Sequence, residues 1–226
     1  GEFSQAAVRS SAAILGVALN TNIYGNAGMV PMMVLSAVPF FNVYAVLILQ
    51  FSPHTDENGR LIPPERNGAA AVRRALVNVV KNPIILGILL GVPFSLLRVK
   101  LPGILASTLS TIGGTATPVA LLAVGASFSG SEAAKCLKPA LAATAIKLFI
   151  LPAIFLPIAA LFGFTGSAMI AILILVGSPT TVSCYVMAKN MGHRGVLTGN
   201  VVMLATVLSS VSLTLWIFLL RLFGLL

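Results

Sequence analysis

The sequence is poor in charged residues and in residue types that bind metals. Only 8% of its 226 residues are charged and 58% are hydrophobic, with a mean hydropathy of +1.02. A soluble domain of this size needs more charged surface, so most of the chain is expected to lie in lipid. Cys136 and Cys184 form no paired motif, and His54 and His193 fall in predicted loops. Neither a disulfide nor a metal site is therefore expected.

Acidic residues are the scarcest charged type, with five against fourteen basic residues and a formal net charge of +9. The basic residues occupy short gaps between apolar runs, which is typical of membrane topology and not of a nucleic-acid-binding face. No predicted span contains Asp or Glu, which disfavours a carboxylate proton relay. The sequence also lacks a nucleophile–base pair and a phosphate-binding glycine loop, so we expect no enzyme chemistry and no cofactor.

Apolar stretches of about 20 residues, the length that crosses a bilayer, occupy most of the chain. The predicted spans are 5–25, 28–51, 82–98, 101–128, 139–162, 166–189 and 195–222. Nine Lys and Arg residues fall on the side of the long polar loop 52–81, and three fall on the other side. By the positive-inside rule, this loop is cytoplasmic and the C-terminus is outside.

A weak internal repeat relates the first two spans to the last two. A shift of 167 residues aligns Ser11 with Ser178, Gly25 with Gly192, and Gly28 with Gly195. Because the two glycine turns fall on opposite sides of the membrane, the helix pairs are predicted to be inverted copies.

The repeat predicts how the chain is divided. Residues 1–51 would be the last two helices of a first five-helix repeat, 52–81 a cytoplasmic loop, and 82–226 the second repeat. The chain begins inside a predicted span and has no signal-peptide layout, so three helices of the first repeat are expected to precede it.

The apolar stretch 167–188 is interrupted by Ser178-Pro179-Thr180-Thr181. Proline breaks or kinks a helix, and Ser followed by Pro suits the start of a new one. A half-helix from Thr180 to Lys189 would aim its positive N-terminal end at the membrane centre and attract a carboxylate. Secondary transporters place their binding sites at such breaks. The alternative is a plain proline kink.

Other polar residues within predicted spans are candidates for the same site. Ser10 and Ser11 form the partner break, next to Arg9, which either extends to the cytoplasmic interface or attracts an anion. Lys147 is the only charged residue well inside a span, where it would be a counter-charge or a titrating group, or would reach for the interface. Asn42 would line a cavity or join two helices.

Four stretches carry a resemblance to a known family. They are VRSSAAILGVAL with IYGNAG; AVPFFNVYAVLIL; KNPIILGILLGVPFSLL with TPVALLAVGASF; and SPTTVSCYVMAKNMG with VLTGNVVMLATVLSSVSLTLW. From Gln5 onward the chain resembles the auxin efflux carrier family, whose bacterial members are described as malate or malonate permeases. The family often has asparagine where Ser11 stands, and proline in the region of Leu15 to Ala18.

The resemblance implies ten helices in two inverted five-helix repeats, a fold similar to that of bile-acid/sodium symporters. The fourth and ninth helices of that fold are broken and cross near the substrate. The expected fold class is thus an all-α, polytopic transmembrane helix bundle with about seven of ten helices present.

The expected function is secondary transport of a small organic anion, such as a dicarboxylate, by alternating access in the cell inner membrane. A passive channel and a non-transporting sensor or scaffold stay open as alternatives, and so does a homodimer. No metal or nucleic-acid partner is expected. The predicted substrate-binding residues are Ser10, Ser11, Asn42, Lys147, Ser178, Pro179, Thr180 and Thr181.

Overall fold

The computed structural model describes residues 1–55, 60–63, 73, 77, 83–97, 99, 101–126 and 130–226. Helices dominate this part of the chain, and the predicted all-α, polytopic helix bundle is confirmed. The helices are α1 (Glu2–Val8), α2 (Ala12–Tyr24), α3 (Val30–Gln50), α5 (Pro83–Leu96), α6 (Gly103–Ala126), α7 (Gly130–Lys135), α8 (Leu137–Ala145), α9 (Leu151–Leu161), α10 (Gly166–Gly177), α11 (Ser183–Asn190) and α12 (Val196–Leu222). A π-helical turn, η1 (Ile146–Ile150), joins α8 to α9.

Four helices of the described residues are long and apolar enough to cross a membrane. They are α3, α6, the continuous helix Leu137–Leu161 and α12. The predicted spans 5–25 and 166–189 are instead each divided into two shorter helices, α1 with α2 and α10 with α11. A two-residue antiparallel pair, β1 (His54–Thr55) and β2 (Leu61–Ile62), follows α3. Much of the predicted loop 52–81 lies outside the described residues.

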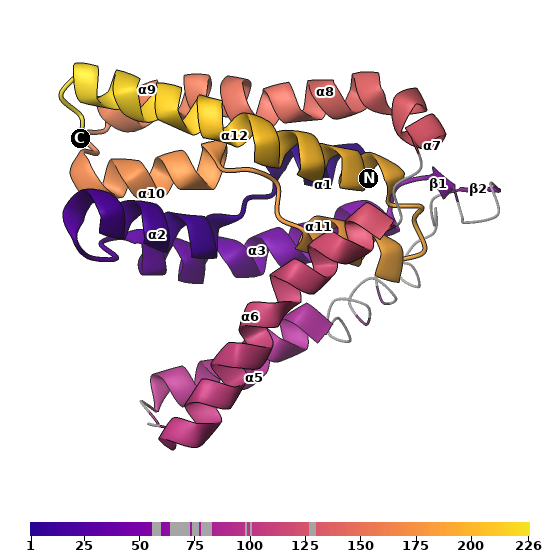
Figure 1. Ribbon diagram of the computed structural model, residues 1–226, viewed down its shortest axis with the longest axis horizontal. Helices are drawn as coiled ribbons and strands as arrows, with labels where there is room; N and C mark the ends of the chain where they lie inside the picture. Colours follow the sequence, from indigo (N-terminus) through magenta and orange to yellow (C-terminus); the bar gives the residue numbers. More distant parts are fainter. Residues whose placement is uncertain are drawn as a thin grey trace.

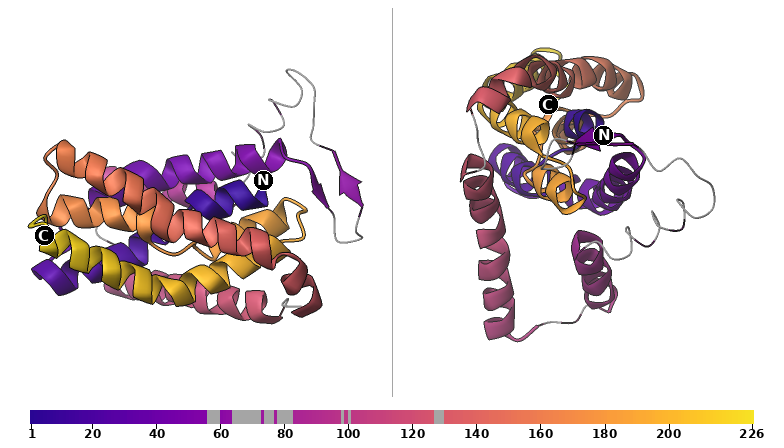
Figure 2. Two further views of the ribbon diagram at one scale, coloured as in Figure 1. Left: turned by 90° about the horizontal axis from the view of Figure 1, so that it is seen from above. Right: turned by 90° about the vertical axis from the view of Figure 1, so that its right-hand side faces the viewer.

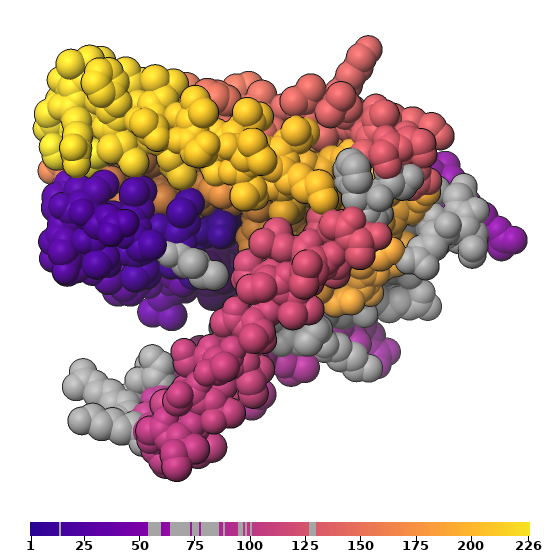
Figure 3. Space-filling view, viewed as in Figure 1, coloured from indigo at the N-terminus to yellow at the C-terminus, as the bar shows by residue number. Residues whose placement is uncertain are grey.

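Most helices lie side by side in one bundle, from which α5 and α6 extend (Figure 1). The N-terminus, α7 and the β1–β2 pair lie at one end of the bundle, and the C-terminus lies at the other (Figure 2). The space-filling view shows α6 extending away from the body that contains α2, α8 and α12 (Figure 3). The described part of the chain therefore has a closely packed body and two helices, α5 and α6, that are separated from each other and largely exposed (Figure 2).

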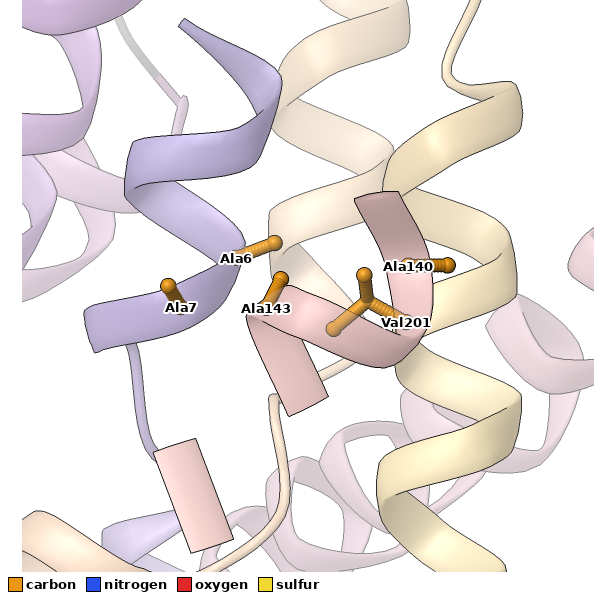
Figure 4. Close-up of a cluster of buried hydrophobic side chains, with 5 residues drawn as sticks. All are labelled: Ala6, Ala7, Ala140, Ala143 and Val201. Atoms are coloured by element: carbon orange, nitrogen blue, oxygen red, sulfur yellow. The ribbon is translucent and has the colours of Figure 1, made fainter. Parts of the chain in front are cut away.

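Small side chains let α1 approach its neighbours closely. Ala6 and Ala7 of α1, Ala140 and Ala143 of α8, and Val201 of α12 form one buried cluster (Figure 4). Apolar side chains gain little from leaving lipid, so helices in membranes associate through close backbone packing, for which alanine is suited. This cluster fixes the short helix α1 against the long helices of the second half of the chain.

The two glycine turns of the predicted repeat have the same backbone conformation. Gly25 and Gly28 have φ values of 76° and 53°, and Gly192 and Gly195 have φ values of 82° and 71°. Glycine adopts this left-handed conformation without a steric penalty, which explains why it stands at all four positions. The turns lie at opposite ends of the bundle (Figure 1). The inverted repeat itself stays a prediction.

Candidate functional site

The first break separates α1 from α2 in the interior of the bundle (Figure 1). α1 ends at Val8, Arg9 has an extended backbone with φ −72° and ψ 139°, and α2 begins at Ala12. Ser11 precedes α2 as its N-cap residue, but its side chain makes no capping hydrogen bond. The first N–H groups of α2 are therefore left without a side-chain partner from the cap.

The second break separates α10 from α11. α10 ends at Gly177, Ser178 is extended with φ −76° and ψ 157°, and α11 begins at Ser183. In both breaks, an extended residue directly follows the last residue of the first helix. The structural correspondence thus pairs Arg9 with Ser178, two positions away from the pairing of Ser11 with Ser178 that the sequence shift predicts.

The prediction that the second half-helix starts at Thr180 is wrong, because α11 starts three residues later. Ser178 precedes a proline, which disfavours helical backbone at that residue. The hydroxyl of Thr180 donates to the carbonyl oxygen of Ala6 at 2.7 Å, so it is bound to α1 and does not cap α11. The break is consequently longer than the sequence suggests.

Direct hydrogen bonds join the two breaks where the helices cross. The backbone N–H of Ser11 donates to the carbonyl oxygen of Pro179 at 2.9 Å. The side-chain amide of Gln5 donates to the carbonyl oxygen of Cys184 at 3.3 Å. With the bond from Thr180 to α1, these contacts satisfy backbone groups that a broken helix would otherwise leave unpaired in the membrane.

Lys147 lies at the ends of α1 and α10. Its Nζ donates to the carbonyl oxygens of Val8 at 3.0 Å and Leu175 at 3.1 Å, and to the hydroxyl of Ser10. That hydroxyl in turn donates to the carbonyl oxygen of Leu175. The Leu175 carbonyl is open to these donors because Pro179, four residues later, has no N–H to offer it. Lys147 is fully buried.

A π-helical turn and a proline shape the helix that carries Lys147. The turn Ile146–Ile150 inserts extra backbone at this position, and such turns are frequent at functional sites. Pro152 has no N–H for the carbonyl oxygen of Leu148, and the indole N–H of Trp216 donates to that oxygen at 2.9 Å. A neighbouring helix again supplies the donor that the proline lacks.

A small cavity of about 130 Å³ opens beside the crossing. Its lining consists of residues from α2, α3, the first residue of α11 and the two breaks: Arg9, Ser10, Ser11, Ala12, Ala13, Val38, Phe41, Asn42, Thr181 and Ser183. The Arg9 side chain is buried, and its guanidinium donates to Oδ1 of Asn42 and to the sulfur of Met187. Both partners are neutral, so Arg9 brings a buried positive charge without a carboxylate beside it in the described part of the chain.

Two half-helices begin at this cavity. Ser11 and Ala12 stand at the start of α2, and Thr181 and Ser183 stand at the start of α11. Helix N-termini carry a partial positive charge and free N–H groups. Together with Arg9, they make the cavity suited to a small anion.

The eight predicted site residues divide into two groups. Those that line the cavity are Ser10, Ser11, Asn42 and Thr181. Those that build the crossing without being part of this lining are Lys147, Ser178, Pro179 and Thr180. The hydroxyl of Ser178 is buried and has no hydrogen-bond partner among the described residues. All eight residues thus belong either to the crossing or to the cavity beside it.

Gln5 and Ser183 are residues of the crossing that the sequence prediction does not include, and Arg9, for which attraction of an anion is one of two interpretations, is absent from the predicted substrate-binding residues. Arg9 is not directed toward water, although its position near a span end favours that expectation. Gln5 and Arg9 are four residues apart around the end of one short helix, which places them on the same side of it. A glutamine four residues before an arginine in an apolar segment is a signal that could have added Gln5 to the prediction.

A larger cavity of about 420 Å³ lies at the end of the bundle near α7. The carboxylate of Glu2 accepts hydrogen bonds from the N–H groups of Gly195 and Thr198, and Glu132 pairs with Arg194. An anion here would meet two carboxylates, so we place no anion site there. Burial, followed by the carboxylate of Glu2, raises the pKa of the nearby Cys136 thiol. Within the described ranges, no three His, Cys, Asp or Glu side chains gather to hold a metal.

The broken helices, their crossing and the apolar spans define a multi-pass membrane protein of the transporter type. The family model described as membrane transport protein matches residues 4–217. The chain thus belongs to the auxin efflux carrier / membrane transport protein family, which confirms the resemblance seen in the sequence. Comparisons with curated proteins and with solved structures gave no match.

Proposed function

We propose that this membrane transport protein is a secondary carrier for a small organic anion such as a dicarboxylate, working by alternating access in the cell inner membrane. The observation that carries the proposal is the buried Arg9 at the crossing cavity. A buried charge that has only neutral partners is costly in a membrane, and an anionic substrate would supply a negative charge beside it. One carboxylate would accept hydrogen bonds from the guanidinium.

The second polar end of the substrate would meet the hydroxyls and half-helix N-termini on the rest of the lining. Ser11, Thr181 and Ser183 are the residues for this role. The cavity of about 130 Å³ is well below the roughly 300 Å³ at which pockets for drug-sized ligands begin, which favours a substrate of a few carbon atoms.

Alternating access is supported by the opposite directions of the two broken helices. α2 runs from the crossing toward the end with the C-terminus, and α11 runs toward the end with α7 (Figure 1). The matching left-handed glycine turns at the two ends support the inverted repeat on which such a mechanism relies. An anion bound at the crossing would lie between a half-helix that runs to one end of the bundle and a half-helix that runs to the other end.

Counterflow of radiolabelled malate in proteoliposomes with the full-length protein tests this proposal. Saturable uptake driven by unlabelled malate inside the vesicles, and its loss in Arg9→Gln, are expected. Arg221→Gln is the matched control, because Arg221 is exposed in the last turn of α12. Single-channel currents without counterflow would favour a passive pore. Malate binding without flux would favour a sensor or scaffold.

A further inference from the structure

The three hydrogens of the Lys147 ammonium match three oxygen acceptors. These are the carbonyl oxygens of Val8 and Leu175 and the hydroxyl of Ser10. An ammonium group has three donors and no acceptor, so its hydrogen-bonding capacity is complete. None of the acceptors is a carboxylate, and the side chain has 0% exposure. Among the described residues, the oxygens that hold the Lys147 amino group are thus all neutral.

Helix geometry explains why these oxygens hold a cation. Val8 is the last residue of α1, and Leu175 lies in the last turn of α10. The final carbonyls of a helix lack partners within the helix, and the C-terminal end carries about half a negative elementary charge. Two such ends meet at one point beside the crossing. Together they supply the negative potential that a carboxylate would otherwise provide.

The set of oxygens is also of the kind that binds an alkali-metal ion. In carriers with broken helices, unwound backbone carbonyls and half-helix C-terminal ends coordinate the coupling Na⁺. Two carbonyls and a serine hydroxyl are hard, neutral ligands that suit this ion. In this protein the position between the two helix ends is occupied by the amino group of Lys147, which comes from the π-helical turn of a neighbouring helix.

We propose that the Lys147 ammonium is a built-in cation that takes the place of a coupling Na⁺ at the crossing. The two helix ends are then held together without an ion from solution, and anion binding at Arg9 does not require Na⁺. Lys147 is a positioning residue and not a ligand of the substrate. It acts through Ser10, whose hydroxyl it contacts and which itself lines the cavity.

A consequence of this assignment is that removing the side chain should create a Na⁺ site. Lys147→Ala would leave the three oxygens around an empty space of the size of the lost side chain. Lys147→Met would remove the charge while filling most of that space. Lys138→Ala is the control, since Lys138 is exposed near the start of the same long helix.

The experiment compares purified proteins in equal concentrations of NaCl and choline chloride, by thermal unfolding and by malate titration. The unaltered protein and Lys138→Ala are expected to have the same melting temperature and malate affinity in both salts. Lys147→Ala is expected to melt about 2–4 °C higher in NaCl than in choline chloride. Lys147→Met is expected to be destabilised in both salts, with no difference between them.

Two results would overturn the inference. One is a malate affinity of the unaltered protein that falls tenfold or more when choline replaces Na⁺. The other is a Lys147→Ala protein whose melting temperature in choline chloride equals that of the unaltered protein. If neither Lys147 variant can be purified, the salt comparison on the unaltered protein decides alone.

The malate arm rests on the proposed carrier function, whereas the melting arm does not. If malate fails to bind in either salt while the Na⁺ response of Lys147→Ala appears, the proposed substrate is wrong and the built-in cation stands. If malate binds only in Na⁺, the substrate stands and the built-in cation is wrong.

Discussion

Two Ser/Thr–Pro segments in this chain have similar composition and opposite structures. Thr117-Pro118 lies within α6, which continues from Gly103 to Ala126 through the proline. Ser178-Pro179 ends α10 and opens a break before α11. α6 is exposed along most of its length, with Leu122 at 73%, whereas Ser178 is fully buried. A proline in an apolar helix is therefore not sufficient to break it.

The difference lies in where the hydroxyl groups find their partners. In α6, Thr108 and Thr111 donate to carbonyls one turn earlier in the same helix, at 2.8 and 2.9 Å. At the crossing, Ser10 and Thr180 donate to carbonyls of a different helix. Groups from a neighbouring helix that can satisfy freed backbone atoms allow a break inside a membrane protein.

Restoring the backbone N–H at the break should have the largest effect. In Pro179→Ala, the new N–H can bond the carbonyl oxygen of Leu175 and compete with Lys147 and Ser10. We expect the rate of malate counterflow to fall by roughly tenfold, which corresponds to a free-energy change of about 1.4 kcal/mol. Pro118→Ala is the matched change in α6. Because Pro118 is exposed and lies within a continuous helix, this change should leave the counterflow rate within about twofold, or about 0.4 kcal/mol. Equal effects of the two changes would contradict the comparison.

Removing a hydroxyl that joins two helices should have the next largest effect. Thr180→Val leaves the buried carbonyl oxygen of Ala6 without its donor, which should lower the unfolding free energy by about 1–3 kcal/mol. Thr111→Val removes a hydroxyl that bonds only its own exposed helix, and should change stability by less than about 0.5 kcal/mol. Denaturant unfolding in detergent measures both. A Thr111→Val protein as unstable as Thr180→Val would show that location at the crossing is irrelevant.

The smallest effect on stability is expected at Ser178. Its buried hydroxyl has no hydrogen-bond partner in the part of the chain that the structure describes, so Ser178→Ala breaks no bond seen there. Removing an unpaired polar atom is neutral or slightly stabilising, and we expect a change within about 0.5 kcal/mol. The same unfolding measurement checks it. A loss above about 1 kcal/mol would mean that the hydroxyl has a stabilising contact after all.

The sequence predicts the fold well because membrane spans depend on local composition. The predicted spans 28–51 and 195–222 agree closely with α3 and α12. The break at Ser178–Thr181 is also predictable, since proline and hydroxyl residues in an apolar run are visible locally. The start of α11 is not predictable in this way, because Thr180 is bound to Ala6, which is 174 residues away in the sequence.

Site residues with distant partners are the hardest to predict. Whether Arg9 reaches toward water or into the protein depends on Asn42 and Met187, and the latter is 178 residues away in the sequence. Lys147 stands out from its position in a span, but its role depends on two helix ends that meet only in the fold. Paired glycines such as Gly113 and Gly114 in general permit close packing of membrane helices. A side-chain carbon added at either would meet no atom within 4 Å in the part of the chain that the structure describes.

The role of Arg9 as the binding group for the anion can be tested by calorimetric titration of malate into three purified proteins. The unaltered protein and Arg221→Gln should bind malate with equal affinity. Arg9→Gln, which keeps a side-chain N–H donor on a shorter side chain and removes the charge, should bind at least about tenfold more weakly, as expected when a charge-assisted bond of roughly 1.5–3 kcal/mol is lost. Unchanged malate binding in Arg9→Gln would contradict the assignment of the crossing cavity as the anion site.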